Sequence, residues 1–492
     1  MNVLLIYPEF PDAIWNFRHA LKFIGKKAYS PPLGLLTVAA MLPKSWELRL
    51  VDINITRLTD DDLAWANYAF ISAMSVQWES AHQSITRCKA SGIKIVAGGP
   101  LFMCDYGQYE EIDHFVLNEA ELTLAPFLAD LERGCAKRFY RSPEFADLRK
   151  SPTPLWELVD INNYASMNLQ FSRGCPYNCE FCNLTILFGR SPRTKDAKQI
   201  VNELNHIYRL GWNGSVFFVD DNFISNKRHL KSEILPALIE WRKGKPGITF
   251  YTEVSINLAD DKELLQMMAE AGFNQVFVGI ETLDDESLDK CGKKQNKNRD
   301  LVENVKHIQR AGLQVMAGFI VGFDTDTPDI FRRQIDFIQQ SGIIMANIAV
   351  LQAPPGTRLY ARLEKEGRLN GNTLFDFLNG TTNILPKMNM VALQEGYKSI
   401  IRHVYATDHY YERVKTFFRE YKQPKIKTSL RLKHFVILCR SFYYLGIIGK
   451  ERFYFWNLLC WAYFRNPKLI PLSVELAIKG HHFNKVVELH VT

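Results

Sequence analysis

Several features that would place this sequence in a simple class are absent. No apolar stretch reaches the roughly 18–20 residues that a membrane-spanning helix needs. Nine cysteines in 492 residues are too few for a secreted disulfide scaffold. There is neither an internal repeat nor a low-complexity segment. With 47% hydrophobic residues, the chain can bury large cores, and its length predicts two or three domains.

The charge is only mildly basic and contains no dense run of Lys and Arg. A formal charge of +7 over 492 residues suits either an anionic partner, such as a lipid surface, or simply a solvated surface. No nucleic-acid motif occurs, so no nucleic-acid partner is expected. The first apolar run lacks a preceding basic segment and is followed by Glu9, which favours a buried strand over a signal peptide. We expect a protein of the reducing cytoplasm.

Strand-like and helix-like stretches alternate over residues 1–140. This alternation predicts a doubly wound parallel sheet of the Rossmann or flavodoxin type. Such sheets bind their ligands at the carboxyl ends of their strands. Residues 141–165 contain Pro143, Pro152 and Pro154 and show little periodicity, which is typical of a linker.

Residues 166–360 repeat the strand–helix pattern, whereas residues 361–492 change character. Six strand–helix units are expected, fewer than the eight of a closed barrel. The pattern therefore predicts a partial (β/α)6 barrel followed by a mostly helical region. Within that region, Arg440–Phe464 is aromatic-rich with Lys and Arg interspersed. Such a stretch either packs as a helical pair on its own domain or lies at a membrane interface.

The strongest local pattern is the C-x3-C-x2-C spacing of Cys175, Cys179 and Cys182. Three thiolates on one short loop can hold an iron–sulfur cluster and leave one iron open for a small molecule. A structural zinc site is the alternative, but it needs four ligands and usually a second C-x2-C arm. The nearest other cysteines along the chain are Cys135 and, beyond the loop, Cys291.

This loop resembles that of the radical S-adenosylmethionine (SAM) superfamily, which has an aromatic residue before the last cysteine, here Phe181. The resemblance extends to polar and glycine residues after successive predicted strands. It implies a [4Fe–4S] cluster on the three cysteines and SAM contacts, although any single carboxylate could instead be a loop cap. The implied SAM contacts are Phe181, Asp220, Asp221, Asn222, Glu253, Ser255, Gly279 and Glu281.

Residues 1–140 resemble the cobalamin-binding domain that precedes many radical SAM cores. Two departures stand out: Asn118–Glu121 replaces a common Gly-Glu-Gly-Glu, and the D-x-H-x-x-G motif is absent, since Asn54 lies two residues after Asp52. The alternative is a flavodoxin-like domain that binds nothing. The implied cobalamin contacts are Pro32, Leu33, Gly34, Ser75, Gly98, Gly99, Pro100 and Glu119.

The three-part layout resembles the subgroup that includes the hopanoid C-2 methylases. It implies methylation of an unactivated carbon in a lipid-like or other complex substrate, through a 5′-deoxyadenosyl radical and methylcobalamin. It also implies a low-potential electron donor such as flavodoxin or ferredoxin. Peripheral contact with the inner face of the membrane is the alternative that the aromatic-rich stretch Arg440–Phe464 leaves open. Two alternatives stay open: a cobalamin-containing oxidoreductase or cyclase that transfers no methyl group, and a cluster-bearing binding or electron-transfer protein without catalysis.

Overall fold

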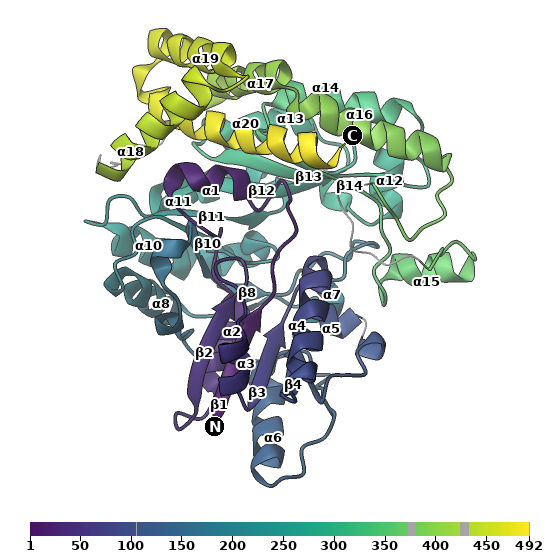
Figure 1. Cartoon of the computed structure of the whole chain (residues 1–492). Coiled ribbons are helices and arrows are strands. Elements are labelled where there is room, and N and C mark those ends of the chain that lie inside the picture. The colour runs from purple at the N-terminus through teal and green to yellow at the C-terminus, as the bar shows by residue number, and fades with distance from the viewer. Residues whose placement is uncertain (105, 372–379, 424–431, 492) are drawn as a thin grey trace.

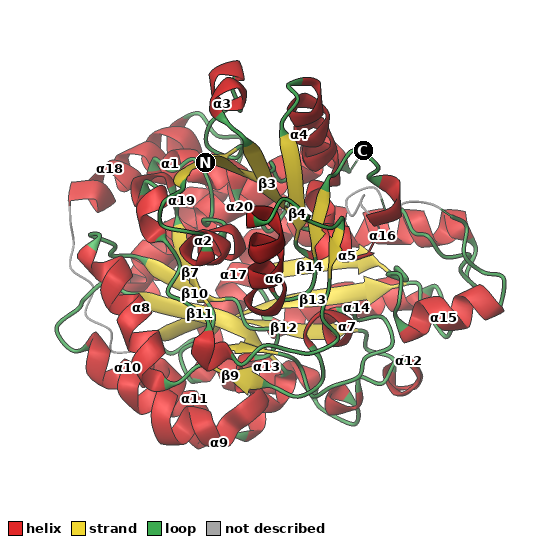
Figure 2. Ribbon diagram, turned by 90° about the horizontal axis from the view of Figure 1, so that it is seen from below, coloured by secondary structure: helices red, strands yellow, loops and turns green. Residues whose placement is uncertain are grey.

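The structure is a computed structural model that describes residues 1–104, 106–371, 380–423 and 432–491. Two parallel six-stranded sheets form its framework. The first sheet lies at the bottom of Figure 1, and the second lies above it beneath a layer of C-terminal helices. Figure 2, seen from below, shows β3 and β4 of the first sheet running steeply in the upper part of the view, whereas β12, β13 and β14 of the second sheet run nearly horizontally lower in the picture.

The first sheet has the strand order β2-β1-β3-β4-β5-β6. The order β2-β1-β3-β4-β5 is that of flavodoxin-like proteins. Both faces are buried, because Val3 and Leu5 of β1 join one apolar core while Leu4 and Ile6 join another. The prediction of a doubly wound sheet is confirmed. The strands are β1 Asn2–Tyr7, β2 Glu47–Asp52, β3 Tyr68–Ser72, β4 Lys94–Gly98, β5 His114–Val116 and β6 Phe139–Tyr140.

Helices flank this sheet at short intervals along the chain. The connections carry α2 Leu33–Met41, α3 Asp60–Trp65, α4 Trp78–Ala90, α5 Pro100–Cys104 and α6 Ala120–Glu132. One helix of this part of the chain, α1 (Arg18–Ile24), lies instead against the C-terminal helix α20 (Ile470–His490).

The second sheet has the order β14-β13-β12-β11-β10-β7, and every pairing in it is parallel. Because β7 and β14 are both edge strands, the sheet is an open, partial barrel, as predicted. Its strands are β7 Ser166–Leu169, β10 Ser215–Phe218, β11 Thr249–Val254, β12 Phe273–Glu281, β13 Gln314–Val321 and β14 Met345–Val350. The helices between them include α8 Ala197–Arg209, α10 Leu235–Arg242, α11 Lys262–Ala271, α12 Asp285–Lys290, α13 Leu301–Arg310 and α14 Asp329–Ser341.

The described residues that follow β14 are mostly helical, as predicted. Helix α20 shares one continuous apolar core with the second sheet and with α1, through residues such as Phe483, Val276 and Phe23. Within the described ranges, no helix is long and apolar enough to cross a bilayer. The C-terminal helices are α15 Arg358–Lys365, α16 Met390–Tyr405, α17 Thr407–Glu420, α18 Leu432–Ser441, a π-helical turn Phe442–Ile447, α19 Arg452–Arg465 and α20.

Candidate functional site

A loop between the short strand β8 (Ser172–Arg173) and helix α7 (Leu184–Phe188) carries the three predicted cluster cysteines, all partly buried. The loop begins at Gly174, whose φ of 98° is in the left-handed region. A Cβ at this position would lie 2.9 Å from the carbonyl oxygen of Ser191. Only glycine therefore lets the chain enter the loop here. The Gly174 N–H donates to Asp221 Oδ2 at 3.0 Å.

The electrostatics of the thiols fit a metal cluster. Burial raises the pKa of all three, and that of Cys182 to about 12. Nearby positive charge from Lys293 acts in the opposite direction on each. The thiolate form therefore needs strong cationic stabilisation, which iron supplies.

Within the described part of the chain, no three His, Cys, Asp or Glu side chains converge closely enough for a single metal ion. A cuboidal cluster bonds each thiolate to a different iron and so holds its ligands farther apart than one ion does. The donor set itself points to a [4Fe–4S] cluster, because three thiolates on one loop leave one iron open, whereas a structural zinc ion takes four ligands.

The far side of the cluster loop is clamped by the barrel and by α15. The Glu180 N–H donates to the carbonyl of Cys291 at 2.7 Å, and its carbonyl accepts from the Leu359 N–H at 3.0 Å. The Glu180 carboxylate accepts from Arg362 at 2.7 Å. Next to it, the Phe181 ring packs edge-on against Phe323 beside a hollow of about 330 Å³. These contacts fix the position of the loop without involving the thiols.

Asp220 and Asp221, two predicted SAM contacts that follow β10, hold the start of the cluster loop. Asp220 is 1% exposed, and its carboxylate accepts from the backbone N–H groups of Phe171, at 3.2 Å, and Ser172. Burial raises the pKa of Asp220 to about 7 and that of Asp221 to about 6. Asp220 therefore anchors the strand that leads into the cluster loop, and Asp221 binds the loop itself at Gly174.

A chain of hydrogen bonds links the ends of β10 and β11 to the cluster loop. Asn222 Oδ1 accepts from the backbone N–H of Ser255 at 3.1 Å. The Ser255 hydroxyl donates to Asn257 Oδ1 at 2.6 Å, and the Asn257 amide donates to the Tyr177 hydroxyl at 3.0 Å. The structure thus brings Asn222 and Ser255 together and gives Tyr177, inside the C-x3-C segment, a defined partner.

Glu253 and Glu281 follow at the ends of β11 and β12. Burial, reinforced by the negative charges of Asp221 and Asp220, raises the pKa of Glu253 to about 8. No described residue donates a hydrogen bond to its carboxylate, although part of the side chain is accessible. An unpartnered carboxylate at this edge is suited to the ammonium or hydroxyl groups of a ligand.

Glu281 lies at a β-bulge in β12 and has a φ of 65°, a left-handed conformation that is costly for a residue other than glycine. The Asn296 amide donates to the carbonyls of Gly279 and Ile280, at 2.9 Å each, and holds the bulge. Lys293 Nζ forms an ion pair with Glu281 at 2.7 Å, both side chains being 12% exposed. A Cβ at Gly279 would lie 2.6 Å from that nitrogen, so a side chain at this position would displace the ion pair.

Lys293 is a site residue that the sequence analysis missed. It follows α12 rather than a strand, and its neighbours carry no motif. Its positive charge nevertheless offsets part of the rise that burial causes in the pKa of all three cluster thiols and of Glu253. It is the shared cation of the cluster loop and the strand-end carboxylates.

The predicted cobalamin contacts lie at the carboxyl edge of the first sheet or at the start of α2. Pro32 is the N-cap of α2, and Leu33 and Gly34 lie in its first turn. Ser75 begins a short 3-10 turn, and Pro100 begins α5. A Cβ at Gly98 would lie 2.8 Å from the Val116 carbonyl oxygen, and one at Gly99 (φ 92°) would lie 2.7 Å from Ser72 Oγ. These glycines are therefore required by close packing of the loops at this edge.

Two buried ion pairs join this edge to the cluster loop. Arg173, two residues before Cys175, donates to both carboxylate oxygens of Glu121 at 2.8 and 3.1 Å. Arg193 donates to both oxygens of Glu119 at 2.7 and 2.8 Å. Burial alone would raise the pKa of Glu121, but the charge and hydrogen bonds of Arg173 outweigh it and lower the pKa to about 2.

Glu119 is 3% exposed and already fully engaged by protein groups, since it also accepts from the Ala146 N–H at a very short distance. The structure therefore shows it as a long-range ion-pair residue, and its contact with cobalamin stays a prediction. Neither Arg173 nor Arg193 could be recognised from the sequence as a partner, because the two arginines lie 52 and 74 residues from the glutamates.

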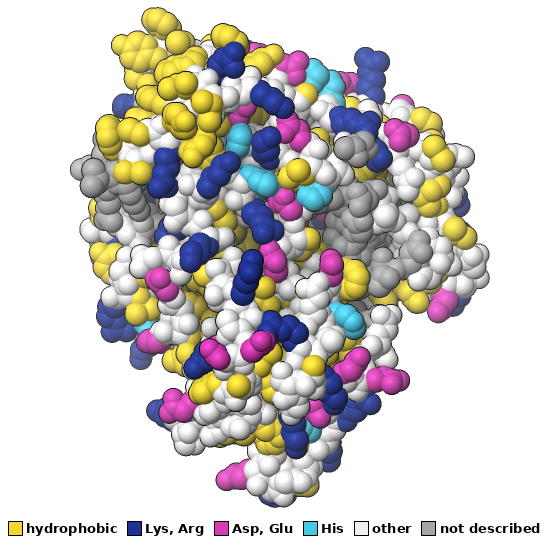
Figure 3. Space-filling model, viewed as in Figure 1, with side chains coloured by type: hydrophobic (Ala, Val, Ile, Leu, Met, Phe, Trp, Pro, Cys, Tyr) yellow, Lys and Arg dark blue, Asp and Glu magenta, His cyan; other side chains and the backbone are white. Residues whose placement is uncertain are grey.

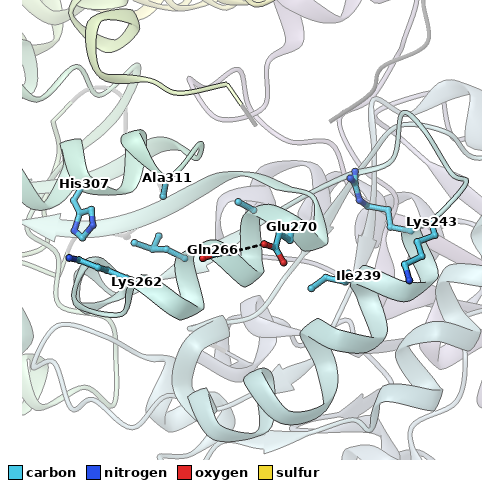
Figure 4. Close-up of a pocket in the computed structure, with 10 residues that line it drawn as sticks. Ile239, Lys243, Lys262, Gln266, Glu270, His307 and Ala311 are labelled. Atoms are coloured by element: carbon cyan, nitrogen blue, oxygen red, sulfur yellow. Dashed lines mark hydrogen bonds between the residues drawn. The ribbon is translucent and has the colours of Figure 1, made fainter. Parts of the chain in front are cut away.

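A separate hollow of about 650 Å³ lies on the outer helical layer, between α10, α11 and α13. Figure 4 shows its lining, with Gln266 donating to Glu270 at 2.8 Å and His307 beside Lys262. It shares no residue with the cluster loop or with the strand-end residues. The larger hollow is thus not the site to which the sequence motifs point.

The comparisons with known proteins agree with this geometry. A family model described as the radical SAM superfamily matches residues 169–338, and one described as a domain of unknown function matches residues 357–492. An uncharacterized methyltransferase of Synechocystis sp. is 38% identical, over 99% of this chain and 92% of its own length. The hopanoid C-2 methylase of Rhodopseudomonas palustris is 33% identical, over 98% of this chain and 92% of its own length. The chain belongs to this family of radical SAM methyltransferases.

The fold of this family member also matches solved structures. The cobalamin-dependent radical SAM enzyme OxsB, with aqua-cobalamin bound, superposes with a TM-score of 0.63 at 15% identity, over 99% of this chain and 80% of OxsB. The methyltransferase TsrM from Kitasatospora setae, with cobalamin and a [4Fe–4S] cluster bound, gives a TM-score of 0.58 at 14% identity, over 98% and 99%. The predicted arrangement of a flavodoxin-like sheet, a partial barrel and a helical region is thereby confirmed.

Proposed function

We propose that this protein is a cobalamin-dependent radical SAM enzyme that methylates an unactivated carbon of a lipid-like substrate. The observation that carries the proposal is the ion pair between Arg173 and Glu121, at 2.8 Å. It joins the carboxyl edge of the flavodoxin-like sheet, where such sheets bind cofactors, to the base of the cluster loop. Relatives named as hopanoid C-2 and hopanoid C-3 methylases support a lipid-like substrate.

Cys175, Cys179 and Cys182 would hold the cluster, with the fourth iron open to SAM. Asp221, Glu253 and Glu281 would surround the charged groups of SAM, and Phe181, Asn222, Ser255 and Gly279 would shape its site. Bound in this way, the cluster and SAM supply a carbon-centred radical, and cobalamin supplies the methyl group. The protein's own part is to position these groups and exclude water, because the cofactors carry the difficult chemistry.

The carboxyl edge of the first sheet would bind cobalamin. Met74 and Trp78, at the end of β3 and the start of α4, are 49% and 41% exposed there and offer apolar surface for a corrin ring. Pro32, Leu33, Gly34, Ser75, Gly98, Gly99 and Pro100 would form the surrounding loops. OxsB and TsrM, which share the fold, are described as cobalamin-bound.

Three domains and a linker would divide this work. Residues 1–140 would bind cobalamin, residues 141–165 would link, residues 166–360 would hold the cluster and SAM, and residues 361–492 would form the helical domain. A low-potential donor such as flavodoxin or ferredoxin would reduce the cluster. Arg190 and Arg358, which donate to carbonyls of the cluster loop at 3.5 and 3.1 Å, supply positive charge for an acidic donor. We place the enzyme in the cytoplasm, at the inner face of the membrane.

The test is an anaerobic assay of the chain reconstituted with iron, sulfide and cobalamin, then given SAM and a low-potential reductant. Formation of 5′-deoxyadenosine is expected from the wild type and not from the variant Cys175→Ala, Cys179→Ala, Cys182→Ala. A matched control, Cys135→Ala, Cys439→Ala, Cys460→Ala, removes three exposed cysteines and should keep the activity. Equal deoxyadenosine from both triple variants would refute the assignment of the cluster.

The same assay separates methyl transfer from its alternative. Transfer of a methyl group through cobalamin produces S-adenosylhomocysteine together with 5′-deoxyadenosine once the lipid substrate is present. A cyclase or oxidoreductase would yield deoxyadenosine alone, and one relative, 24% identical over 69% of this chain, is named as a magnesium-protoporphyrin monomethyl ester cyclase. Absence of S-adenosylhomocysteine with a consumed substrate would decide for that alternative.

A further inference from the structure

An exposed apolar surface covers the outside of α18, the π-helical turn and α19. Eleven of the 24 large hydrophobic side chains exposed in the described residues fall between positions 435 and 464. Figure 3 shows hydrophobic side chains gathered at this corner, at the upper left. We call these eleven the aromatic surface: Phe435, Val436, Tyr443, Tyr444, Ile447, Ile448, Phe453, Tyr454, Trp456, Tyr463 and Phe464.

Helix α19 carries the largest side chains of this surface, which no part of the chain that the structure describes covers. Its inner face buries residues such as Phe455 and Leu458, both fully buried against the C-terminal helices. Its outer face exposes Phe453 at 74% and Phe464 at 85%. A helix that is apolar on both faces normally lies inside a protein or against lipid. The outer face of α19 therefore requires something outside the fold described here.

The charges in this region have one sign. Residues 432–468 contain six Lys and Arg residues and a single acidic residue, Glu451. Glu451 is turned inward, with its side chain 14% exposed and paired with His481 at 2.6 Å. Lys450, by contrast, has an 88% exposed side chain, and Arg452 and Arg465 are exposed at the two ends of α19. The aromatic surface is thus flanked by cations, and no carboxylate of residues 434–468 is exposed.

We propose that the aromatic surface docks onto the interface of an anionic lipid bilayer. Trp and Tyr side chains favour the headgroup region, and flanking Lys and Arg favour negative headgroups. A second copy of the chain fits less well, because a two-fold contact would place these cations against one another. The inference rests on the proposed function, since a lipid substrate gives the enzyme a reason to reach a bilayer.

The test uses the full chain and vesicles of phosphatidylcholine, with and without phosphatidylglycerol, in a flotation assay at low salt. The wild type should float with the anionic vesicles and bind the neutral ones more weakly. Phe453→Ser with Phe464→Ser should weaken binding to both vesicle types by at least about tenfold, because the inserted rings are lost. Lys450→Gln, Arg452→Gln, Arg465→Gln should weaken binding to the anionic vesicles by about a hundredfold, since each cation contributes about fivefold.

The control variants remove exposed apolar side chains or the same number of charges elsewhere. Val391→Ser with Leu489→Ser alters residues that are 67% and 58% exposed outside the aromatic surface, and it should bind as the wild type does. Arg133→Gln, Lys243→Gln, Arg332→Gln carries the same change in net charge on side chains at least 68% exposed. Its binding should also stay close to that of the wild type.

No binding of the wild type to anionic vesicles at low salt would overturn the proposal, as would equal losses in the surface and control variants. A wild-type dimer in sedimentation that Phe453→Ser with Phe464→Ser makes monomeric, without vesicle binding, would assign the surface to a second copy instead. Formation of 5′-deoxyadenosine is measured in the same preparations, in buffer without detergent. Loss of vesicle binding with intact deoxyadenosine formation would contradict docking alone, and vesicle binding without deoxyadenosine would contradict the proposed radical chemistry alone.

Discussion

The ion pair between Glu121 and Arg173 provides a quantitative test of how the two sheets are joined. The Glu121 side chain is 8% exposed and accepts two hydrogen bonds from Arg173 and one from the Ser151 hydroxyl. Its pKa is lowered from 4.5 to about 2. A difference of this size corresponds to about 3 kcal/mol of stability at neutral pH. We expect Glu121→Gln to lower the free energy of unfolding by about 2–4 kcal/mol.

The pH dependence follows from the sign of the shift. Because the folded pKa lies below the unfolded one, the stabilisation is complete above about pH 4.5 and disappears as the pH falls toward 2. The difference in the free energy of unfolding between the wild type and Glu121→Gln should therefore become smaller as the pH falls from about 4.5 to 2. Denaturant unfolding, followed by tryptophan fluorescence and circular dichroism, measures this free-energy difference at each pH.

The control is Glu157→Gln. Glu157 also forms an ion pair across the chain, with His206 at 2.7 Å, but its side chain is 54% exposed, so its loss should cost less than about 0.5 kcal/mol. A Glu121→Gln protein as stable as the wild type at neutral pH would refute the argument that this pair couples the two parts of the molecule. Retained iron content in an equally stable variant would refute it for the cluster loop as well.

Three further predictions follow from the site and the core. Lys293→Met leaves the buried Glu281 carboxylate without its cation, so we expect it to lower the free energy of unfolding by about 3–5 kcal/mol and to abolish most SAM cleavage. Lys290→Met, which breaks an exposed ion pair, should change neither quantity. Intact SAM cleavage by Lys293→Met would contradict the role of Lys293. Gly174→Ala should lower the iron content per chain, because the added Cβ would lie too close to the carbonyl oxygen of Ser191. Gly211→Ala is the control, since Gly211 has a similar φ but open space around it. An equal iron content in the two variants would argue against the steric explanation. Burial lowers the pKa of His482 to about 4, so the free energy of unfolding of the wild type should fall by up to about 3 kcal/mol as the pH falls from 6.5 to 4. His482→Gln should lose less stability over the same pH range. An identical pH dependence of the melting temperature in the two proteins would exclude this histidine as the cause.

Sequence spacing was sufficient for the parts of this protein that depend on neighbouring residues. The C-x3-C-x2-C loop, the strand–helix alternation and the aromatic character of residues 440–464 are all local patterns. Parallel sheets bring the ends of successive strands to one edge, so Asp221, Glu253 and Glu281 could be predicted to lie together without a structure. The fold class and the family followed from these patterns, and both were confirmed.

Only the tertiary structure could decide which of these residues are held by the protein itself. The sequence does not show that Asp220 caps the strand into the cluster loop, or that Glu119 is paired by Arg193 across 74 residues. It also does not show that α1 leaves its own sheet to pack against α20, more than 440 residues later. Such contacts depend on how separate elements pack, and no local periodicity or spacing encodes them. Local sequence patterns therefore determined the kind of chemistry, and long-range packing determined how the carboxyl edge of the first sheet is joined to the cluster loop.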